Sequence, residues 1–302
     1  MNKYQKELEA LLKKQYASAS DELKKAYGKS LKEIKNKVEY YMMQHSSLSY
    51  AQKLEVARLT SLMVQIENEL DFLSDVQQQH VYKYLQSSGH VAYNELFYDF
   101  EQTHGFSIEF NLLNRDLIQT IIDTPIKGIK LSARLNDGVI STLKANLLSQ
   151  LQIGLAQGKS YAEMAQALSD VADSSYKRAM TIMRTEAGRV QAVTRQKSQT
   201  EADNQGVEFE KVWSSTLSLA TRDTHRALDG QAVKPNEKFK SPSGHAALQP
   251  HMFGVAKEDI NCRCRTYSRV KGVKPELRRD NETKKVVKYR NYKEWEKGRS
   301  VA

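Results

Sequence analysis

Proline is almost absent from the first three quarters of this 302-residue chain. Only Pro125 lies before residue 235, whereas the other prolines fall between residues 235 and 275. Proline removes a backbone donor and clashes with the preceding turn inside a helix. The residues before about 204 can therefore be almost wholly helical, and those after it cannot. This distribution predicts a mainly α-helical protein with a small C-terminal α+β module.

Hydrophobic periodicity indicates that the first helices are long. Two apolar stripes advance in steps of three or four residues, which is the period of an amphipathic α-helix. The stripes consist of Leu23, Tyr27, Leu31, Ile34, Val38 and Tyr41, and of Leu59, Leu62, Ile66, Leu70 and Leu73. We expect a long-helix N-terminal bundle or antiparallel hairpin over residues 1–110. The aromatic-rich segment 87–110, with Gly89 and Gly105, predicts a break between helical layers.

Helical periodicity resumes over residues 111–204 and predicts a second helical domain. Residues 154–160, Gly-Leu-Ala-Gln-Gly-Lys-Ser, resemble a phosphate-binding loop, but one residue is missing between the glycines and no strand pattern precedes them. We interpret Gly158 as the end of one helix. Ser160 and Glu163 then form a capping box that begins the next helix.

The pattern changes to short strands after residue 204. Residues 206–213 and 262–270 each have strand character, and turn residues divide the chain between them. We therefore expect a compact α+β module over residues 205–270. Within it, Glu208 and Glu210 form a Glu-x-Glu pair of the kind found in ADP-ribosyltransferases. A Ser-Ser-Thr run follows this pair instead of preceding it, so we interpret the glutamates as the outer face of a strand.

Positive charge is concentrated at the C-terminal end. The chain has 46 Lys+Arg against 36 Asp+Glu, a net charge of +10, and residues 271–302 contain 11 Lys+Arg and 5 Asp+Glu, a net charge of +6. Such a basic tail attracts phosphates without reading base sequence. The expected DNA-binding residues are Lys271, Lys274, Arg278, Arg279, Lys284, Lys285, Lys288 and Arg290. In the same tail, the spacing of Tyr289, Tyr292 and Trp295 suggests one helical turn that docks on a partner.

The chain offers no membrane span, because no run approaches 18 apolar residues. Its two cysteines, Cys262 and Cys264, exclude a disulfide framework and favour a reducing compartment. Together with His225 they offer three zinc ligands, and Asp259, Asp223 or His251 would supply a fourth. The alternative is a buried thiol pair with a hydrogen-bonded histidine and aspartate. Zinc is therefore the expected ion, with no cofactor certain.

Several motifs occur here in a fixed order. They are Arg184-Thr185-Glu186 on a helix, Trp213 on a strand, the run Thr221-Arg222-Asp223-Thr224-His225-Arg226-Ala227-Leu228-Asp229-Gly230, and Asn261-Cys262-Arg263-Cys264. This order resembles the phage head morphogenesis family, the Mu F-like minor capsid proteins, from about residue 120 to the end. The structural family motif comprises Arg184, Thr185, Glu186, Trp213, Asp229, Gly230 and Asn261.

The resemblance implies a virion component without catalytic activity. Such a protein binds the phage portal vertex inside the procapsid, contacts genomic DNA, and supports head assembly and DNA ejection. Scaffolding or major capsid protein would be further partners. The implied location is the interior of the head near the portal, after assembly in the host cytoplasm.

The resemblance also implies a zinc site at His225, Asp259, Cys262 and Cys264. This chain departs from the family pattern, because Arg222 stands where a first ligand is usual and Asp259-Ile260 replaces His-Pro.

Two alternatives remain open from the residues alone. A metal-dependent nuclease would use the His-Asp-Cys cluster, although the carboxylates that hold a catalytic Mg²⁺ form no recognisable set. A DNA-compacting basic protein would need no portal partner.

Overall fold

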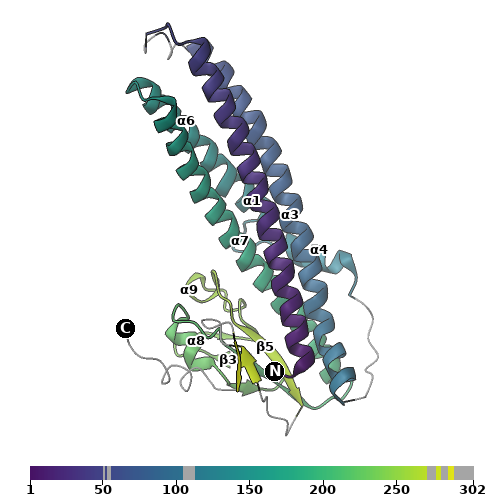
Figure 1. Cartoon of the computed structure of the whole chain (residues 1–302). Coiled ribbons are helices and arrows are strands. Elements are labelled where there is room, and N and C mark those ends of the chain that lie inside the picture. The colour runs from purple at the N-terminus through teal and green to yellow at the C-terminus, as the bar shows by residue number, and fades with distance from the viewer. Residues whose placement is uncertain (50–51, 53–55, 105–112, 271–276, 280–284, 289–302) are drawn as a thin grey trace. The chain divides into compact units, whose positions relative to one another are not determined.

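The computed structural model describes residues 1–49, 52, 56–104, 113–270, 277–279 and 285–288 (Figure 1). It divides into two compact units that are discontinuous in sequence. Unit 1 comprises Met1–Gln15, Leu85–Ile122 and Arg184–Ala302, and unit 2 comprises Tyr16–Tyr84 and Asp123–Met183. The four ranges expected from the sequence stay a prediction.

The residues before 205 are almost entirely helical, as the scarcity of proline predicts. The helices are α1 (Lys3–Gln44), α3 (Val56–His104), α4 (Arg115–Asp123), α5 (Leu131–Leu135), the π-helical turn η1 (Asn136–Ile140), α6 (Ser141–Ala156) and α7 (Tyr161–Asn204). Pro125 lies between α4 and α5. The predicted fold class, long helices followed by a module of short strands, is confirmed.

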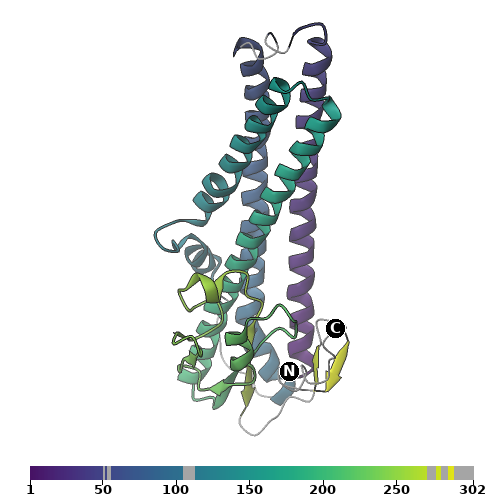
Figure 2. The ribbon, with the colours of Figure 1, turned by 90° about the vertical axis from the view of Figure 1, so that its left-hand side faces the viewer.

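Unit 2 is an antiparallel bundle of α1, α3, α6 and α7, with α5 and η1 leading into α6 (Figures 1 and 2). As the residue numbers increase along α1, the numbers of their contact partners on α3 decrease, so these two helices are antiparallel. The same holds for α1 with α7 and for α3 with the α5–α6 segment. The pairs are Glu22–His80, Tyr27–Gln77 and Ser30–Glu69, then Ser20–Tyr176 and Lys35–Ser169, then Gln77–Leu135, Ser74–Asn136 and Glu67–Lys144.

The apolar stripes form the core of this bundle. All the stripe residues except Leu31 are buried. Gly158, at φ 66°, ends the preceding helix. The backbone N–H of Ser160 donates to the Glu163 carboxylate at 2.8 Å, and the backbone N–H of Glu163 donates to the Ser160 hydroxyl at 3.3 Å. The capping box is thus confirmed. Because helix α6 leads directly into this turn, it lacks the strand that a phosphate-binding loop requires.

The predicted break after residue 87 is wrong for the described part of that segment. Helix α3 continues without interruption to His104, and residues 105–112, including Gly105, lie outside the described residues. Gly89 marks a close approach instead. A Cβ there would lie 2.9 Å from Val190 Cγ1 on α7 and 3.3 Å from Ile118 Cγ2 on α4.

The module in unit 1 is built on a three-stranded antiparallel sheet. Strand β1 (Phe209–Ser214) lies between β2 (Ala232–Val233) and β5 (Arg265–Val270). In the register, Lys211 pairs with Val233 on one side and with Ser268 on the other. The expected strand character of 206–213 and 262–270 is therefore confirmed, with shorter limits.

Smaller elements complete the module. These are α8 (Asp223–Leu228), α9 (Ala256–Asp259), the antiparallel pair β3 (Phe239–Lys240) and β4 (Ala246–Ala247), and the pair β6 (Leu277–Arg279) and β7 (Val286–Lys288). In the described part of the chain, no helix has both the length and the hydrophobicity that crossing a bilayer requires.

Buried polar contacts fix the sheet to the helices of unit 1. Glu95 on α3 binds Arg195 on α7 at 2.9 Å and also binds Arg265 on β5. Gln199 on α7 donates to the Ser268 hydroxyl of β5 at 3.0 Å. These contacts hold β5, and with it the residues just before β5, against α7.

Candidate metal centre

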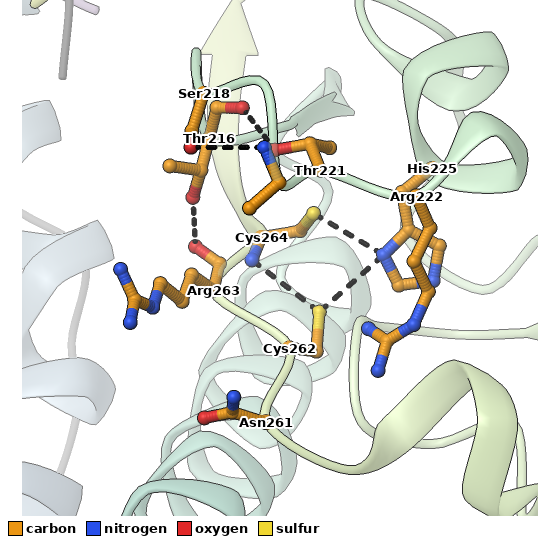
Figure 3. A pocket seen from close by; sticks show the side chains of 10 residues that line it. Thr216, Ser218, Thr221, Arg222, His225, Asn261, Cys262, Arg263 and Cys264 are labelled. Carbon is orange, nitrogen blue, oxygen red and sulfur yellow. Dashed lines mark hydrogen bonds between the residues drawn. The ribbon is translucent and has the colours of Figure 1, made fainter. Parts of the chain in front are cut away.

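Three side chains converge at the start of β5 (Figure 3). The Nδ1 atom of His225, on α8, lies 3.5 Å from Sγ of Cys262 and 3.4 Å from Sγ of Cys264. All three side chains are buried, and their ligand atoms lie within 4.8 Å of one another. The structure therefore brings together three of the four metal ligands expected from the sequence.

A small apolar core surrounds these ligands. Trp213, Leu228 and Phe239 are each fully buried and pack with the two cysteines. The ring of His225 contacts Trp213 edge to face, with 5.5 Å between the ring centroids, and stacks on Phe253, with 6.0 Å between the centroids. Such packing restricts the imidazole to one orientation and excludes bulk water from one side of the site.

The Asp-Gly turn after α8 ties this helix to β1. Gly230, at φ 79°, donates its N–H to the carbonyl of Trp213, and Asp229 accepts the N–H of Ser215 at 2.7 Å. The Ser215 hydroxyl donates to the carbonyl of His225 at 2.6 Å. The motif residues Trp213, Asp229 and Gly230 thus lie next to the ligand His225 and position α8.

The Arg-Thr-Glu motif of α7 positions the other half of the site. Asn261 lies at φ 57°, a left-handed conformation that asparagine tolerates better than most residues. Its backbone N–H donates to the Thr185 hydroxyl at 3.0 Å, and its side-chain oxygen accepts from Arg184. Glu186 is fully buried and pairs with Arg189 at 2.8 Å. Arg184 and Thr185 therefore fix the turn that presents Cys262.

Glu258 lies on the far side of the histidine from the cysteines. Its Oε2 atom is 2.9 Å from Nε2 of His225 and accepts from the Thr224 hydroxyl at 2.9 Å. Although burial disfavours the carboxylate, hydrogen bonds from Ser243 and Thr224 lower the pKa of Glu258. A carboxylate on the second nitrogen is the arrangement that orients metal-binding histidines.

Asp259, the fourth expected ligand, does not belong to this cluster. Its carboxylate accepts backbone N–H groups of Phe253, Gly254 and Val255, at distances of 3.2, 2.7 and 3.2 Å. Burial raises the pKa of Asp259 while these three hydrogen bonds oppose that rise. The structure places it as the anchor of the loop before α9.

The other two residues considered as a fourth ligand also lie elsewhere. Asp223 has a side chain that is 95% exposed and pairs with Arg226. His251 is buried, and burial together with the charges of His225 and Arg222 lowers its pKa to about 3. Hydrogen bonds of its ring with the backbone at Asp259 and Cys262 oppose this fall in pKa.

Zinc fits the three converging side chains. Zn–S bonds of about 2.3 Å and Zn–N bonds of about 2.0–2.1 Å at tetrahedral angles separate sulfur from nitrogen by about 3.5 Å. The observed separations are 3.4 and 3.5 Å. The ligand set therefore suits a tetrahedral zinc ion, which would cross-link α8 to the residues before β5.

The protonation of the cysteines is unequal without a metal. A hydrogen bond from Cys262 and a further one from His225 hold the pKa of the Cys264 thiol well below its usual range, against the effect of burial. The pKa of Cys262 is raised because it donates to Cys264 and is buried. Burial disfavours the imidazolium, but Cys264 and Glu258 outweigh it and raise the pKa of His225. The cluster thus already favours one thiolate.

The expected DNA-binding residues fall mainly outside the described side chains. Lys285 is exposed, Arg278 and Arg279 lie on β6, and Lys288 lies on β7. The remaining four lie outside the described residues: Lys271, Lys274, Lys284 and Arg290. The same holds for Tyr289, Tyr292 and Trp295.

Two contributors to the site do not emerge from motif reasoning. Glu258 directly precedes the expected ligand Asp259, and its position on the short α9 turns it toward His225. Gly188 lies one turn after Arg184 on α7, where a Cβ would meet Nε2 of His251 at 2.1 Å. The signal available for Gly188 was a glycine in the middle of a strongly periodic helix.

Known proteins are similar to this chain in sequence. Residues 145–267 match the sequence profile described as phage Mu protein F like protein. The chain is also 30% identical over 314 residues to minor head protein GP7 of Bacillus phage SPP1, and the match covers 99% of this chain and 98% of GP7. The chain belongs to the Mu F-like family of phage minor head proteins. The family suggested by the ordered motifs is therefore confirmed.

A second relative of the Mu F-like chain has an enzyme's name. NAD(+)–arginine ADP-ribosyltransferase EFV of Enterococcus faecalis is 40% identical over 295 residues. That match covers 98% of this chain but only 60% of EFV, so the chain spans about three fifths of that protein's length. No solved structure matches the chain.

Proposed function

We propose that this Mu F-like protein binds the portal vertex inside the procapsid, contacts genomic DNA without sequence preference, and supports head assembly and DNA ejection. The observation that carries the proposal is the end-to-end similarity to GP7, which is named as a minor head protein. The similarity covers 98% of GP7 and 99% of this chain, so it supports a role for the long helices as well as for the module. Scaffolding or major capsid protein are further candidate partners in the head.

The charge distribution supports the DNA contact. Residues 271–302 hold +6 of the net charge of +10, and this concentration favours binding to phosphates over binding to specific bases. A position inside the head near the portal would expose such a segment to packaged DNA at very high local concentration.

We further propose that the chain has no catalytic activity. Glu210 of the Glu-x-Glu pair forms an ion pair with Arg269 on the neighbouring strand at 2.8 Å, as a glutamate on the outer face of a sheet does. Lys211, the next residue along the strand, is fully buried. The enzyme activity named for EFV then belongs to the part of EFV that lies beyond this chain.

The metal ligands support a structural role for zinc in this function. A zinc ion on His225, Cys262 and Cys264 would stabilise a module that buries a small apolar core. Purified full-length protein is expected to contain about one zinc per chain, and less than about 0.2 per chain would contradict the site. His225→Asn should lose the metal, whereas His245→Asn, at a histidine outside the cluster, should keep it.

Copurification with the portal protein encoded alongside this chain tests the main proposal. Nuclease-treated portal oligomer is expected to retain the full-length protein at low and at high salt, because docking of apolar helix surface is weakly screened. Loss of binding at both salt concentrations would contradict the portal partner. Binding only at low salt would assign the contact to the basic tail.

A matched pair of variants separates portal binding from DNA binding. Lys→Gln at Lys271, Lys274, Lys284 and Lys285 removes four charges from the tail, and Lys→Gln at Lys14, Lys24, Lys29 and Lys32 removes four exposed charges from α1. The tail variant should lose DNA and keep the portal. If the tail variant kept DNA binding and the α1 variant lost it, the DNA contact would be assigned to the helices.

A further inference from the structure

A cavity adjoins the three metal ligands, and Glu258 does not belong to its lining (Figure 3). Its volume is about 120 Å³, and its lining includes His225, Cys262 and Cys264. The ligands are buried, whereas Ala220, Asn261 and Arg263 on the lining are exposed, so the cavity opens to the surface. One water molecule occupies about 30 Å³ in the liquid. The space therefore accommodates a small ligand next to the ligand atoms.

The described part of the chain supplies no fourth side chain at this position. The cluster of close ligand atoms contains a histidine and two cysteines only. Asp259 uses its oxygens for backbone amides, and Glu258 lies at the other ring nitrogen of His225, Nε2. Zinc bound by three protein ligands keeps an open coordination position, whereas closed sites use four.

The side chains around the open position favour negative charge. Arg222 lines the cavity and directs its guanidinium to the carbonyls of Glu258 and Ile260, which holds it beside the cysteines. Arg263 lies on the same lining, and hydroxyls of Thr216, Ser218 and Thr221 complete it. No carboxylate belongs to the lining. Zn²⁺ with two thiolates and a neutral imidazole has no net charge, and the Glu258 carboxylate at Nε2 of His225 does not belong to the lining. The two fully charged side chains on the lining, Arg222 and Arg263, are both positive, and they favour an anion in the cavity.

We propose that the metal held by His225, Cys262 and Cys264 keeps its fourth coordination position open to this cavity, where it binds a small anion that Arg222 attracts. This inference rests on the metal site of the proposed function. It makes the site a ligand-binding centre in addition to a cross-link. Arg222 is then a specificity-determining residue, because its guanidinium is held at the lining by the carbonyls of Glu258 and Ile260.

Cobalt substitution of the full-length protein tests the metal and the open position separately. Binding of Co²⁺ should produce a thiolate-to-cobalt charge-transfer band, and sodium azide should change the visible spectrum as it enters the fourth position. Absence of the charge-transfer band would contradict the metal site itself. A band with a spectrum that azide leaves unchanged would contradict the open position and leave the metal site standing.

X-ray absorption spectroscopy of the zinc-loaded protein gives an independent count of the sulfur and nitrogen or oxygen atoms bound to the metal. Two sulfur scatterers at about 2.3 Å and two lighter scatterers at about 2.0–2.1 Å are expected. In Arg222→Cys, a third sulfur should join and the cobalt form should lose its response to azide. A third sulfur in the unchanged chain, or four nitrogen or oxygen scatterers, would contradict the ligand set.

Three arginine variants test the role of the charge. Arg222→Met should keep the metal and weaken azide binding by about tenfold, the loss expected for one charge-assisted contact. Arg222→Lys should restore most of that affinity. Arg226→Met, at an α8 arginine outside the lining, should leave it unchanged. Equal azide affinity in Arg222→Met and the unchanged chain would overturn the assignment of Arg222.

Discussion

The absence of a side chain at Gly188 on α7 leaves room for the loop that contains His251. The ring of His251 lies where a Cβ of residue 188 would be, 2.1 Å from Nε2, so only glycine fits at Gly188. His251 itself adopts φ 66°, a conformation that the surrounding contacts must hold in place. One residue on a helix thus determines whether the loop before Cys262 can pack.

Gly188→Ala is therefore expected to destabilise the protein. The added methyl group must displace a buried ring, and overpacking of this kind costs about 1–3 kcal/mol. Chemical unfolding followed by tryptophan fluorescence measures the change, because one of the two tryptophans, Trp213, lies in the core next to the site. The control is Gly28→Ala on α1, where no atom lies within 4 Å of the new Cβ. That change should stabilise its helix by about 0.5–1 kcal/mol. Equal effects of the two substitutions would contradict the packing argument.

Lys211 is a buried cation with a specific pH signature. Its side chain is 0% exposed, and Nζ donates to Gln196 at 3.0 Å and to the carbonyl of Leu248 at 2.8 Å. Burial lowers the pKa of Lys211 to about 8, from an ordinary value of 10.5. Between these values the unfolded chain binds more protons than the folded chain, so the free energy of unfolding rises with pH in this window.

The free energy of unfolding should increase with pH by up to about 1.4 kcal/mol per pH unit between pH 8 and pH 10.5. Urea unfolding of the full-length protein at pH 8 and pH 10, compared with Lys211→Met, isolates this residue from other groups that titrate in the same range. The variant should lack the rise. Parallel pH profiles in the two proteins would show that the folded pKa of Lys211 is not lowered.

At the scale of elements, periodicity predicts the helices and fails where a glycine has two possible roles. The stripes ending at Tyr41 and Leu73 are buried as predicted, because the 3.6-residue period leaves one apolar face to pack. The sequence predicts a break at Gly89, yet α3 continues through this residue. The absence of a side chain at Gly89 leaves room for Val190. Sequence alone does not distinguish a packing glycine from a terminating one, since the difference lies in a partner about a hundred residues away.

The candidate site was predictable to a similar extent. Cysteine and histidine types identify His225, Cys262 and Cys264, because few other residues bind zinc. The choice between Asp259 and Glu258 depends on the turn of α9, which directs one carboxylate to backbone amides and its neighbour to His225. A four-residue helix leaves no periodic signal from which this direction could be inferred.

Helix α7 should influence metal affinity through Thr185. Its hydroxyl accepts the N–H of Asn261, directly before Cys262, so Thr185→Val removes a support of the ligand loop. Loss of such outer contacts typically costs about 10–100-fold in metal affinity. Competition titration of zinc with a chelator measures it. Thr181→Val, one turn earlier on the same helix, is the control and should leave zinc affinity unchanged. A similar affinity loss in both variants would assign the effect to the helix and not to the Asn261 contact.

At the scale of the whole molecule, positive charge is distributed unevenly between the C-terminal tail and the rest of the chain. Residues 271–302 have a net charge of +6, so the first 270 residues account for the remaining +4 of the total of +10. Affinity for DNA that comes from phosphate contacts falls with salt, and its logarithmic slope is about −0.9 per contact. Neutralising tail lysines should therefore flatten the salt dependence more than neutralising the same number on the helices.

The slope of the salt dependence should distinguish the tail from the helices. Lys→Gln at Lys271, Lys274, Lys284 and Lys285 should reduce its magnitude by up to about 3.6, which is four contacts at about 0.9 each. Fluorescence anisotropy with two duplexes of unrelated sequence, at several salt concentrations, measures it. Both duplexes should give the same slope, since phosphates are read and bases are not. The matched α1 variant at Lys14, Lys24, Lys29 and Lys32 carries the same net charge, so it controls for overall electrostatic attraction. Equal slopes for the two variants would mean that total charge, and not the tail, governs DNA binding.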